Sequence, residues 1–439
     1  YAGKVLDRKA VDTWANELAS YWYPSYNTDL VPPSDQWPDE TTESEVRDTL
    51  AGAIFEEPTV VVLGKPQGSS IYNVFVVEGF TEVARRTAAG AIAPKGEGFP
   101  VEAVTEPLKT AIAAELRAHG SWDQWTSELE PLYARVRTAL EKRNASLKAL
   151  TGRDGFLFYR ASLDQMVGGD LRAQPKGKDP FPVIVEFKDM LVEAGVDFLF
   201  VPVPTKAAVF PDKLERTDAG LAGTIVSPHE RKLIQELSAA GVEVVDLLPL
   251  YLAERNKPAA EELYLAQDTH WTDRGLQLAA HLIGERIKSY PWYVDLAKNP
   301  TTFGTKKVTF THQGDLPSRL ADSEQARYKP LKLRGTQVLT PGGEPYVDVP
   351  ESPITVLGDS FTGVYQRTFC RHAGLSAHIA KEISYPVDLV MSYGGGPNVR
   401  KKLLRRGKDA LRNERLIIWV MAARDLYNYW EDWELLESK

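Results

Sequence analysis

Ser360, His270 and Asp268 are the residues of this 439-residue sequence whose types and spacing most readily combine into chemistry. A serine hydroxyl is a poor nucleophile until an imidazole accepts its proton, and the imidazole needs an acceptor at its second nitrogen to fix its tautomer. Asp268 lies two residues before His270, so its carboxylate can reach Nδ1 while Nε2 faces outward. The set predicts acyl transfer through a serine. The alternative is that Asp268 caps the following helix and His270 is an ordinary polar loop residue.

The predicted surroundings of Ser360 suit a nucleophile. The apolar run from Ile354 to Leu357 indicates a buried strand that ends in the turn Gly358-Asp359-Ser360, and a helix is expected from there to about residue 372. A serine at the start of that helix gains from free N–H groups and the positive dipole end, which stabilise an oxyanion. The tripeptide alone occurs by chance in roughly one chain in ten of this length, so the prediction depends on the other residues.

A tetrahedral intermediate also needs hydrogen-bond donors for its oxyanion. The Ser360 amide is one candidate. A glycine-rich loop after the next predicted strand offers amides with no side chain in the way, namely Gly394, Gly395 and Gly396. Arg424 follows the last predicted strand and could direct its guanidinium into the same crevice. It could instead form a structural salt bridge with Asp425 or Asp359.

Aromatic side chains near these motifs could stack on sugar rings, whose C–H faces pack well against π systems. The candidates are Trp271, Tyr365, Tyr393 and Trp419. Aromatic residues beside a sheet usually belong to the core, which is the expectation for Trp419. For Trp271 both interpretations stay open, and Tyr393 and Trp271 are kept as candidate substrate contacts.

Composition argues against several classes of function. The net charge of −8 argues against a surface for nucleic acid or anionic membrane, because both need a concentrated basic face. The basic run from Arg400 to Arg405 is interpreted as the solvated face of a helix. Cys370 is the only cysteine, so no intramolecular disulfide is possible and no disulfide-linked partner is expected. Asp268 and His270 supply two ligands only, so no metal site is predicted, and the chemistry requires no cofactor.

The ends and the apolar runs of the sequence say little about its compartment. No apolar run approaches the roughly 20 residues of a membrane span, and no signal peptide heads the sequence. The chain begins at Tyr1 without a methionine, which indicates a trimmed or mature product. An N-terminal signal or anchor could have been removed from it.

From residue 151 onward the sequence alternates between predicted strands and helices. Such alternation is typical of a parallel sheet covered by helices on both sides, and strands buried on both faces read as continuous apolar runs. The predicted strands after the short one at Gly155–Tyr159 are Asp197–Val203, Val242–Val245, Ile354–Leu357, Asp388–Met391 and Leu416–Met421. The fold class predicted is therefore α/β, and the ends of these strands are expected to converge on one crevice.

The chain is predicted to contain two regions. Residues 1–150 are expected to form a separate α+β region of unknown role, which begins with an amphipathic helix at Val5–Trp22. The segment Gly64–Ser70 in that region is interpreted as a hairpin loop, because it lacks the spacing of a phosphate-binding loop. Residues 151–439 are expected to form the catalytic domain, with a β-rich insertion at about 299–350.

Several of these motifs resemble a known family. Gly358-Asp359-Ser360-Phe361 resembles the first block of the SGNH hydrolase superfamily. Asp268-Thr269-His270-Trp271 resembles the alginate O-acetyltransferase (AlgJ/AlgX) group, in which the Asp-x-His pair precedes the serine. Gly155–Phe158 and Val203–Lys206 are also similar to segments of that group. The resemblance covers about residues 151–439 and implies an SGNH-like sheet with an Asp268, His270, Ser360 triad.

One departure from the superfamily pattern concerns the oxyanion site. The Gly-x-Asn-Asp block of SGNH esterases appears here as Ala422-Ala423-Arg424-Asp425, which puts Arg424 at the position of the oxyanion asparagine. The sequence ends about 15 residues after this strand, which leaves no room for the carbohydrate-binding module that AlgX carries. The layout is therefore expected to be closer to that of AlgJ.

The resemblance implies an O-acetyltransferase that acts on an extracytoplasmic polysaccharide or oligosaccharide through an acetylated Ser360. It also implies a periplasmic location and, as a partner, a membrane protein that delivers acetyl groups. Two alternatives stay open. An acetylesterase would use the same triad with water as the acceptor, and a non-catalytic carbohydrate-binding scaffold would keep the fold without the reaction.

Overall fold

The computed structural model describes residues 60–64, 73–77, 102–215, 220–258, 261–407 and 410–436. The chain divides into two compact units, one made of residues 1–94 with 287–299 and the other of residues 95–286 with 300–439. In the first unit, β1 (Val60–Gly64) pairs antiparallel with β2 (Asn73–Val77). The predicted helix Val5–Trp22 and the predicted loop between these two strands lie outside the described residues.

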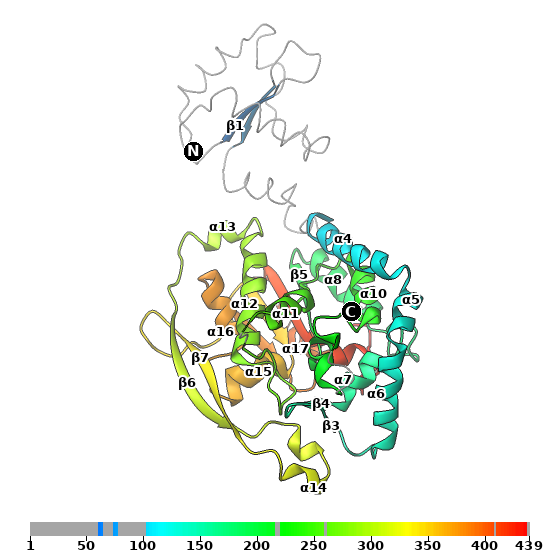
Figure 1. The fold of residues 1–439 in the computed structure, drawn as a ribbon. Helices are drawn as coiled ribbons and strands as arrows, with labels where there is room; N and C mark the ends of the chain where they lie inside the picture. Colours follow the sequence, from blue (N-terminus) through cyan, green and yellow to red (C-terminus); the bar gives the residue numbers. More distant parts are fainter. Residues whose placement is uncertain are drawn as a thin grey trace. The chain divides into compact units, whose positions relative to one another are not determined.

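A four-stranded parallel sheet forms the centre of the second unit (Figure 1). Its strand order is β5 (Asp197–Val203), β10 (Leu416–Ala422), β8 (Ile354–Gly358) and β9 (Asp388–Met391). Every residue of β8 and β10 is buried, as expected for strands covered on both faces. The parallel sheet with helices predicted from the sequence is confirmed.

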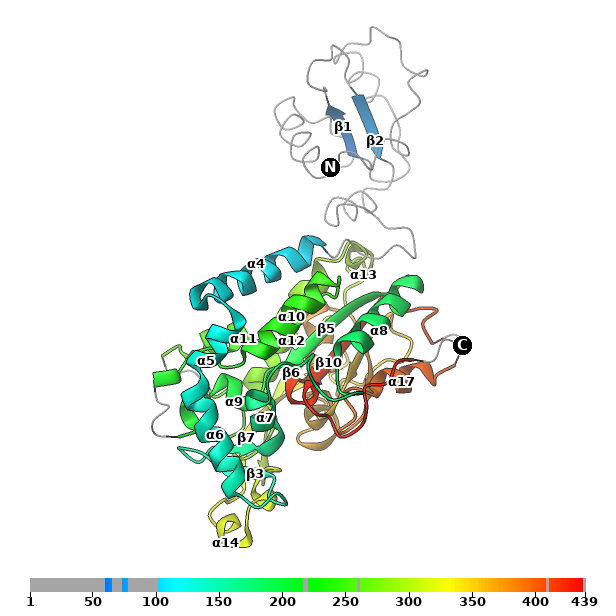
Figure 2. The same cartoon turned by 90° about the vertical axis from the view of Figure 1, so that its right-hand side faces the viewer.

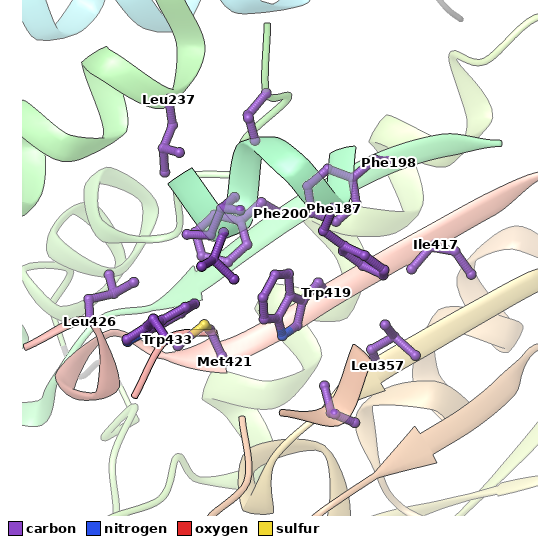
Figure 3. Packing of buried hydrophobic residues seen from close by; sticks show 14 of the residues in the cluster. Phe187, Phe198, Phe200, Leu237, Leu357, Ile417, Trp419, Met421, Leu426 and Trp433 are labelled. Carbon is purple, nitrogen blue, oxygen red and sulfur yellow. The ribbon is translucent and has the colours of Figure 1, made fainter. Parts of the chain in front are cut away.

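The core beside this sheet is built around Trp419 of β10 (Figure 3). Its fully buried indole has edge-on contacts with Phe187 and Phe200, at centroid distances of 5.4 and 5.7 Å. Ile418 and Val420 alternate with Trp419 along the strand and so point to the other face, where they too are fully buried. Both sheet faces are therefore covered, and the expectation that Trp419 belongs to the core is confirmed.

The helices of the second unit pack around this sheet. Against β5 lies α8 (Phe181–Glu193), and α10 (Pro228–Ala239) lies beside α8 (Figure 2). The longer of the remaining helices are α7 (Arg160–Val167), α11 (Leu248–Arg255), α12 (Asp273–Lys288), α16 (Leu375–Ile383) and α17 (Val399–Leu404). Three short ones are α9 (Lys206–Val209), α14 (Asp322–Gln325) and α15 (Ser360–Gly363), whereas the short helix α13 (Tyr293–Leu296) belongs to the first unit. No helix in the described part of the chain is both long and apolar enough to cross a bilayer.

Three helices before residue 150 belong to the same compact unit as the sheet, whereas the sequence indicated a division at 150. These are α4 (Glu102–His119), α5 (Trp122–Glu128) and α6 (Glu130–Lys142). The buried guanidinium of Arg231 on α10 donates to both carboxylate oxygens of Glu115 on α4, each at 2.8 Å. The hydroxyl of Tyr133 on α6 donates to the Val226 carbonyl at 2.8 Å. Buried polar groups of the sheet region therefore depend on partners from α4 and α6.

Two strand pairs lie outside the main sheet. The predicted strand Gly155–Tyr159 forms β4 (Leu157–Tyr159), but it pairs antiparallel with β3 (Ala149–Thr151). The predicted strand Val242–Val245 is reduced to one bridge between Val244 and Phe200. In the β-rich insertion, β6 (Gly304–His312) pairs antiparallel with β7 (Leu331–Leu339) to form a long hairpin (Figure 1).

Candidate active site

Ser360 lies at the carboxyl end of the sheet, where the neighbouring strands β10 and β9 also end. It is the first residue of α15 and follows β8 after a single residue, Asp359. One carboxylate oxygen of Asp359 accepts from the Phe361 amide and the other from the Ala422 amide, both at 2.8 Å. A Cβ on Gly358 would lie 2.2 Å from Thr362 Cγ2, so this turn needs glycine. The nucleophile turn is thereby fixed to the end of β10.

Asp268 and His270 lie on a tight turn between residues that form an antiparallel bridge, Tyr264 and Trp271. The Leu265 amide donates to the His270 carbonyl at 3.0 Å and closes the turn. Within it, the His270 amide donates to Asp268 Oδ1 at 2.9 Å. The turn conformation therefore brings the carboxylate and the imidazole together before any distant residue contributes.

The structure brings the three predicted residues into one hydrogen-bonded series. His270 Nδ1 lies 2.6 Å from Asp268 Oδ1, and His270 Nε2 lies 2.8 Å from Ser360 Oγ. Both distances are within the range expected for a nucleophile, its base and the group that orients the base. The side chains of Asp268 and His270 are buried, and that of Ser360 is partly exposed. The hydroxyl is thus open to a substrate while its partners are shielded from water.

A second histidine, His312, contacts the same carboxylate and was not found from the sequence. His312 Nε2 lies 2.6 Å from Asp268 Oδ2, and the Asp315 amide donates to that oxygen at 2.9 Å. Burial alone would raise the pKa of Asp268, but the charge and hydrogen bonds of His270 and the hydrogen bond from His312 outweigh it. They hold the pKa of Asp268 well below its usual value, so the group is a carboxylate.

Residues 312–316, here called the clamp loop, begin at the last residue of β6 and lie against the Asp268 turn. Asp315 accepts hydrogen bonds from the Thr269 amide at 2.8 Å and from the Thr269 hydroxyl at 2.9 Å. Gly314 has φ of +80°, and a Cβ there would lie 2.1 Å from the Gln267 carbonyl oxygen. The glycine is required both by its backbone conformation and by this close approach.

Lys206 supports the Asp268 turn through hydrogen bonds to backbone carbonyls that precede Asp268. Its buried ammonium donates to the carbonyls of Leu265 and Ala266, at 2.8 and 3.0 Å. Burial lowers the pKa of Lys206 to about 7, while the nearby Asp268 and Asp315 act in the opposite direction. The Ala266 carbonyl also accepts from the Leu157 amide, at 2.8 Å. The two further sequence segments that resembled the AlgJ/AlgX group therefore meet at this turn.

The three glycines predicted as oxyanion donors differ in their availability. The Gly395 amide donates to the Ser392 carbonyl at 3.0 Å, so the prediction fails for Gly395: its single N–H is already used. Gly396 lies beside the nucleophile turn, because a Cβ there would be 3.4 Å from Asp359 Oδ2. Gly394 has φ of +69°, and its carbonyl accepts from the Tyr429 hydroxyl at 2.5 Å. The amides of Gly394 and Gly396 stay candidates.

Arg424 lies near the residue that follows Ser360 and within ion-pair distance of Asp425. Its role as an oxyanion donor stays a prediction. Its guanidinium carbon is 5.6 Å from the ring centroid of Phe361, the residue after Ser360, and 5.5 Å from that of Tyr159. Its Nε lies 3.6 Å from Asp425 Oδ1, which makes an ion pair without a hydrogen bond. Burial, with a smaller effect of Asp359, raises the pKa of Asp425 to about 7 against the opposing effect of Arg424.

The aromatic candidates divide into core and surface residues. Trp271 is fully buried, with an edge-on contact to Phe361 at 5.1 Å, so the interpretation of Trp271 as a sugar contact is wrong. Tyr365 is fully buried as well. Tyr393 is 53% exposed, and its hydroxyl lies 2.7 Å from Thr368 Oγ1. Trp430 is an exposed tryptophan that the sequence analysis did not single out. Its Nε1 lies 3.4 Å from the Gly394 carbonyl oxygen, in the loop that carries Tyr393.

One group of metal-ligating side chains occurs in the part of the chain that the structure describes. It consists of Asp268, His270 and Asp315, whose ligand atoms lie within 4.8 Å of one another. These are the atoms already engaged in the hydrogen bonds of the Asp268 turn and the clamp loop. The arrangement fits a proton-transfer network, and the expectation of no metal remains a prediction.

Comparison with known proteins places this site in a family. Residues 149–423 match the family described as SGNH hydrolase-like domain, acetyltransferase AlgX. The probable alginate O-acetylase AlgJ of Pseudomonas fluorescens is 24% identical over 286 residues, which cover 63% of this chain and 67% of AlgJ. The alginate biosynthesis protein AlgX of Azotobacter vinelandii is 30% identical over 121 residues, or 27% of this chain and 24% of that protein. The matched part of the chain thus spans 67% of the length of this AlgJ and 24% of the length of this AlgX.

A solved structure agrees with this at the level of the fold. Pseudomonas aeruginosa AlgX matches with a TM-score of 0.51 at 19% sequence identity, over 66% of each chain. The family match covers more than half of this chain and includes Asp268, His270 and Ser360. The chain belongs to the family of SGNH hydrolase-like domains of the acetyltransferase AlgX.

Proposed function

We propose that the protein is a serine-dependent O-acetyltransferase that acts on an extracytoplasmic polysaccharide of the alginate type through an acetyl-enzyme intermediate. The observation that carries the proposal is the series from Ser360 Oγ through His270 to Asp268, with distances of 2.8 and 2.6 Å. Membership of the family supports the acetyl group as the one transferred, because relatives are named as alginate O-acetylases.

The first half of the reaction loads the enzyme. Ser360 Oγ attacks the carbonyl carbon of the acetyl donor while His270 Nε2 takes the hydroxyl proton, and the carbonyl oxygen becomes an oxyanion. Collapse of the tetrahedral intermediate breaks the bond to the donor's leaving group, which takes the proton from His270. The products are acetyl-Ser360 and the protonated leaving group. Asp268 stabilises the imidazolium that forms between the two proton transfers.

The second half runs the same steps with a sugar hydroxyl as the nucleophile. His270 Nε2 takes the proton of that hydroxyl, and the sugar oxygen attacks the acetyl carbonyl carbon. Ser360 leaves as the alcohol after His270 returns the proton, and the acetyl ester is now on the sugar. Water in place of the sugar hydroxyl gives acetate, so an esterase would share every step except the acceptor.

Three groups around Ser360 could stabilise the oxyanion. Ser360 begins α15, so its amide has no acceptor within the helix. Gly396 lies beside Asp359, and the guanidinium of Arg424 lies over Phe361. Donors fixed in advance at the position of developing charge are typically the largest single contribution to such reactions. We assign this role to the Ser360 amide and to Arg424.

A basic cavity beside Tyr393 suits an acidic polymer. It has a volume of about 620 Å³ and is lined partly by cationic side chains from η5 (Val364–Thr368) and from α17 and the residues after it, namely Arg367, Lys402, Arg405 and Arg406. Arg367 and Arg406 pair with Asp348 and Asp388, and Lys402 donates to the Met391 carbonyl. Arg405 has no acidic partner among the described residues, which leaves net positive charge in the cavity.

Tyr393, which lines this cavity, lies beside α15, the helix that begins at Ser360. A Cβ on Gly363, three residues after Ser360, would lie 3.2 Å from Tyr393 Cε1. A polymer bound along Tyr393 would therefore run close to the end of β8, and its carboxylates would meet the cations of the cavity. We propose this cavity as the acceptor-binding region, with Tyr393 as the stacking residue.

Ser360→Ala tests the proposed reaction. Acetyl release from a chromogenic acetyl ester is expected to fall by roughly 10³-fold or more, because the acetyl group has no other acceptor in the triad. Ser323→Ala is the matched control, since Ser323 is an exposed serine on α14 that does not line this cavity, and its replacement should leave the rate unchanged. A serine-reactive phosphonate should add to Ser360 in the wild type, as read by peptide mass spectrometry. Unchanged acetyl release in Ser360→Ala, or no adduct, would contradict the reaction and favour a non-catalytic scaffold.

Transfer and hydrolysis are separated by their products. Incubation of the wild type with an acetyl ester donor and de-acetylated alginate oligosaccharides should give acetylated sugar, detected by mass spectrometry. Acetate alone, with no acetylated sugar at any acceptor concentration, would contradict transfer and identify an acetylesterase. The comparison measures the second half of the reaction independently of the first.

A further inference from the structure

The second histidine on Asp268 has no role in the reaction as derived above. Asp268 is buried, and its four hydrogen bonds come in two pairs. The pair on Oδ1 comes from the backbone and the ring of His270, within the same turn. The pair on Oδ2 comes from the His312 ring and the Asp315 amide, in the clamp loop. The carboxylate is therefore held from two sides by parts of the chain that are far apart in sequence.

His312 is itself held in place on the side away from Asp268. Its ring lies against the ring of Phe369, at a centroid distance of 4.1 Å and an interplanar angle of 44°. Phe369 is also 6.2 Å edge-on from the His270 ring, so one aromatic side chain contacts both imidazoles. The His312 side chain is 21% exposed, whereas that of Asp268 is 1% exposed. The His312 ring is therefore packed against Phe369 while its Nε2 reaches the buried carboxylate of Asp268.

We propose that His312 is a positioning residue for the reaction, which acts through Asp268 by fixing the plane of its carboxylate toward His270. The inference rests on the proposed function, because it assigns His312 to the Ser360, His270, Asp268 series. His312 bonds Oδ2 of Asp268, whereas His270 bonds Oδ1 and Ser360, so the proposed role of His312 runs through Asp268. Its contribution is to orient the group that orients the base.

The physical argument concerns rotation of the carboxylate. Without His312, Oδ2 keeps only the Asp315 amide as a donor, and a carboxylate held by fewer donors turns more readily about its Cβ–Cγ bond, which weakens its alignment with His270 Nδ1. Two donors on each oxygen restrict that rotation, and hydrogen bonds to a charged group are stronger than those between neutral groups. Catalytic groups need to be held within about 0.5 Å of the productive geometry, so the loss is expected in the rate and not in substrate binding.

His312 and His270 each form a hydrogen bond with one oxygen of the negatively charged Asp268 carboxylate. The other charged groups that face Asp268 are Lys206 on α9 and Asp315 in the clamp loop, and the buried hydroxyl of Tyr365 lies nearby. The side-chain hydrogen bonds to the Asp268 carboxylate in the described residues come from the imidazoles of His270 and His312. Without His312, His270 would be the only side chain of the two that still donates a hydrogen bond to this carboxylate.

The test measures hydrolysis of a chromogenic acetyl ester by the full chain carrying His312→Phe. This variant keeps a ring against Phe369 and removes the donor to Asp268. The expected result is a kcat lower by about tenfold with a KM within about twofold of the wild type. His312→Gln keeps an N–H near the position of Nε2 and should restore most of kcat. Gln313→Ala, in the same clamp loop, is the matched control and should leave both constants unchanged.

A double-mutant cycle shows whether His312 acts through Asp268. In an Asp268→Asn background, His312→Phe should cost little more, because the carboxylate to be oriented is already gone. A full tenfold loss in that background would overturn the inference, as would an unchanged kcat in His312→Phe. So would a loss in His312→Gln equal to that in His312→Phe. If Ser360→Ala keeps its activity, the proposed function fails; if Ser360→Ala is inactive and His312→Phe is not, only this inference fails.

Discussion

At the scale of single residues, the site combines local and distant partners for Asp268. The Asp-x-His spacing was enough to predict the hydrogen bond between Asp268 and His270, because the turn itself brings the two groups together. His312 could not be predicted in the same way. It lies 44 residues further along the chain, and its only signal in the sequence is a histidine that follows an expected strand at Lys306–Thr311. Which residue of a hairpin reaches another turn depends on register and packing, which the sequence pattern does not specify.

Arg424 gives the prediction that belongs at this scale. We expect Arg424→Met to lower kcat/KM for an acetyl ester by roughly 10- to 100-fold, because a cation beside the developing oxyanion is replaced by a neutral side chain of similar length. Arg424→Lys keeps the charge but not the planar guanidinium, so an intermediate loss is expected. Steady-state kinetics on the folded variants measures the effect. Full activity in Arg424→Met would leave Arg424 with the structural ion pair to Asp425 alone.

At the scale of elements, apolar runs predicted the strands of the main sheet well. Asp197–Val203 and Asp388–Met391 have the bounds that were expected, and the runs after Ile354 and Leu416 differ by one residue at one end. These strands are buried on both faces, so hydrophobicity alone marks them. Val242–Val245 has the same apolar character but forms only one bridge, at Val244. Its place beyond β5 at the edge of the sheet is a property of the tertiary structure.

The start of α10 shows a local motif that the tertiary structure overrides. Ser227-Pro228-His229-Glu230 reads as a capping box, yet the Ser227 side chain makes no cap hydrogen bond. Glu230 is instead buried, where Gln165 Nε2 donates to it at 3.1 Å. Burial raises the pKa of Glu230 to about 7, and Asp246 contributes in the same direction. The helix therefore begins with a carboxyl group that prefers to stay protonated.

Glu230→Gln tests this consequence through stability. A carboxyl group whose folded pKa is raised from 4.5 to about 7 binds more protons in the folded state between those values, so its ionisation makes folding less stable as pH rises through that window. Glutamine keeps an acceptor for Gln165 without the charge. We expect the variant to gain on the order of 1–3 kcal/mol in unfolding free energy at pH 8 and little at pH 4, as measured by denaturant unfolding. Equal stability at both pH values in wild type and variant would contradict the assignment.

At the scale of the whole molecule, net charge hides an uneven distribution. The chain carries −8 overall, and this charge argued against a broad basic surface for nucleic acid or anionic membrane. The structure nevertheless gathers Arg367, Lys402, Arg405 and Arg406 around one cavity beside Tyr393. The sequence showed only the run from Arg400 to Arg405 on an expected helix, and Arg400 of that run is buried. A local basic region in an acidic protein can be recognised only when the elements that carry it are placed together.

Arg405→Gln is the prediction for this cavity. Arg405 has no acidic partner among the described residues, so its removal should leave the fold and the hydrolysis of a small acetyl ester unchanged. Acetyl transfer to an acidic oligosaccharide should show a KM raised several-fold, with a weaker dependence on salt, because one charge contact is lost and such contacts are screened by ions. Initial rates at two ionic strengths measure both effects. An unchanged KM for the acidic acceptor would place the polymer elsewhere.

The position of β10 in the sheet has a consequence for how the protein is made. β10 is the last strand of the described chain, yet it lies between β5 and β8, which therefore do not pair with each other. The Ala422 amide at its end also holds Asp359 beside Ser360. A growing polypeptide that has emerged only as far as residue 400 therefore has its serine, its histidine and its aspartate but no central strand to align them. The arrangement of these residues can therefore be completed only after synthesis of the chain has passed residue 422.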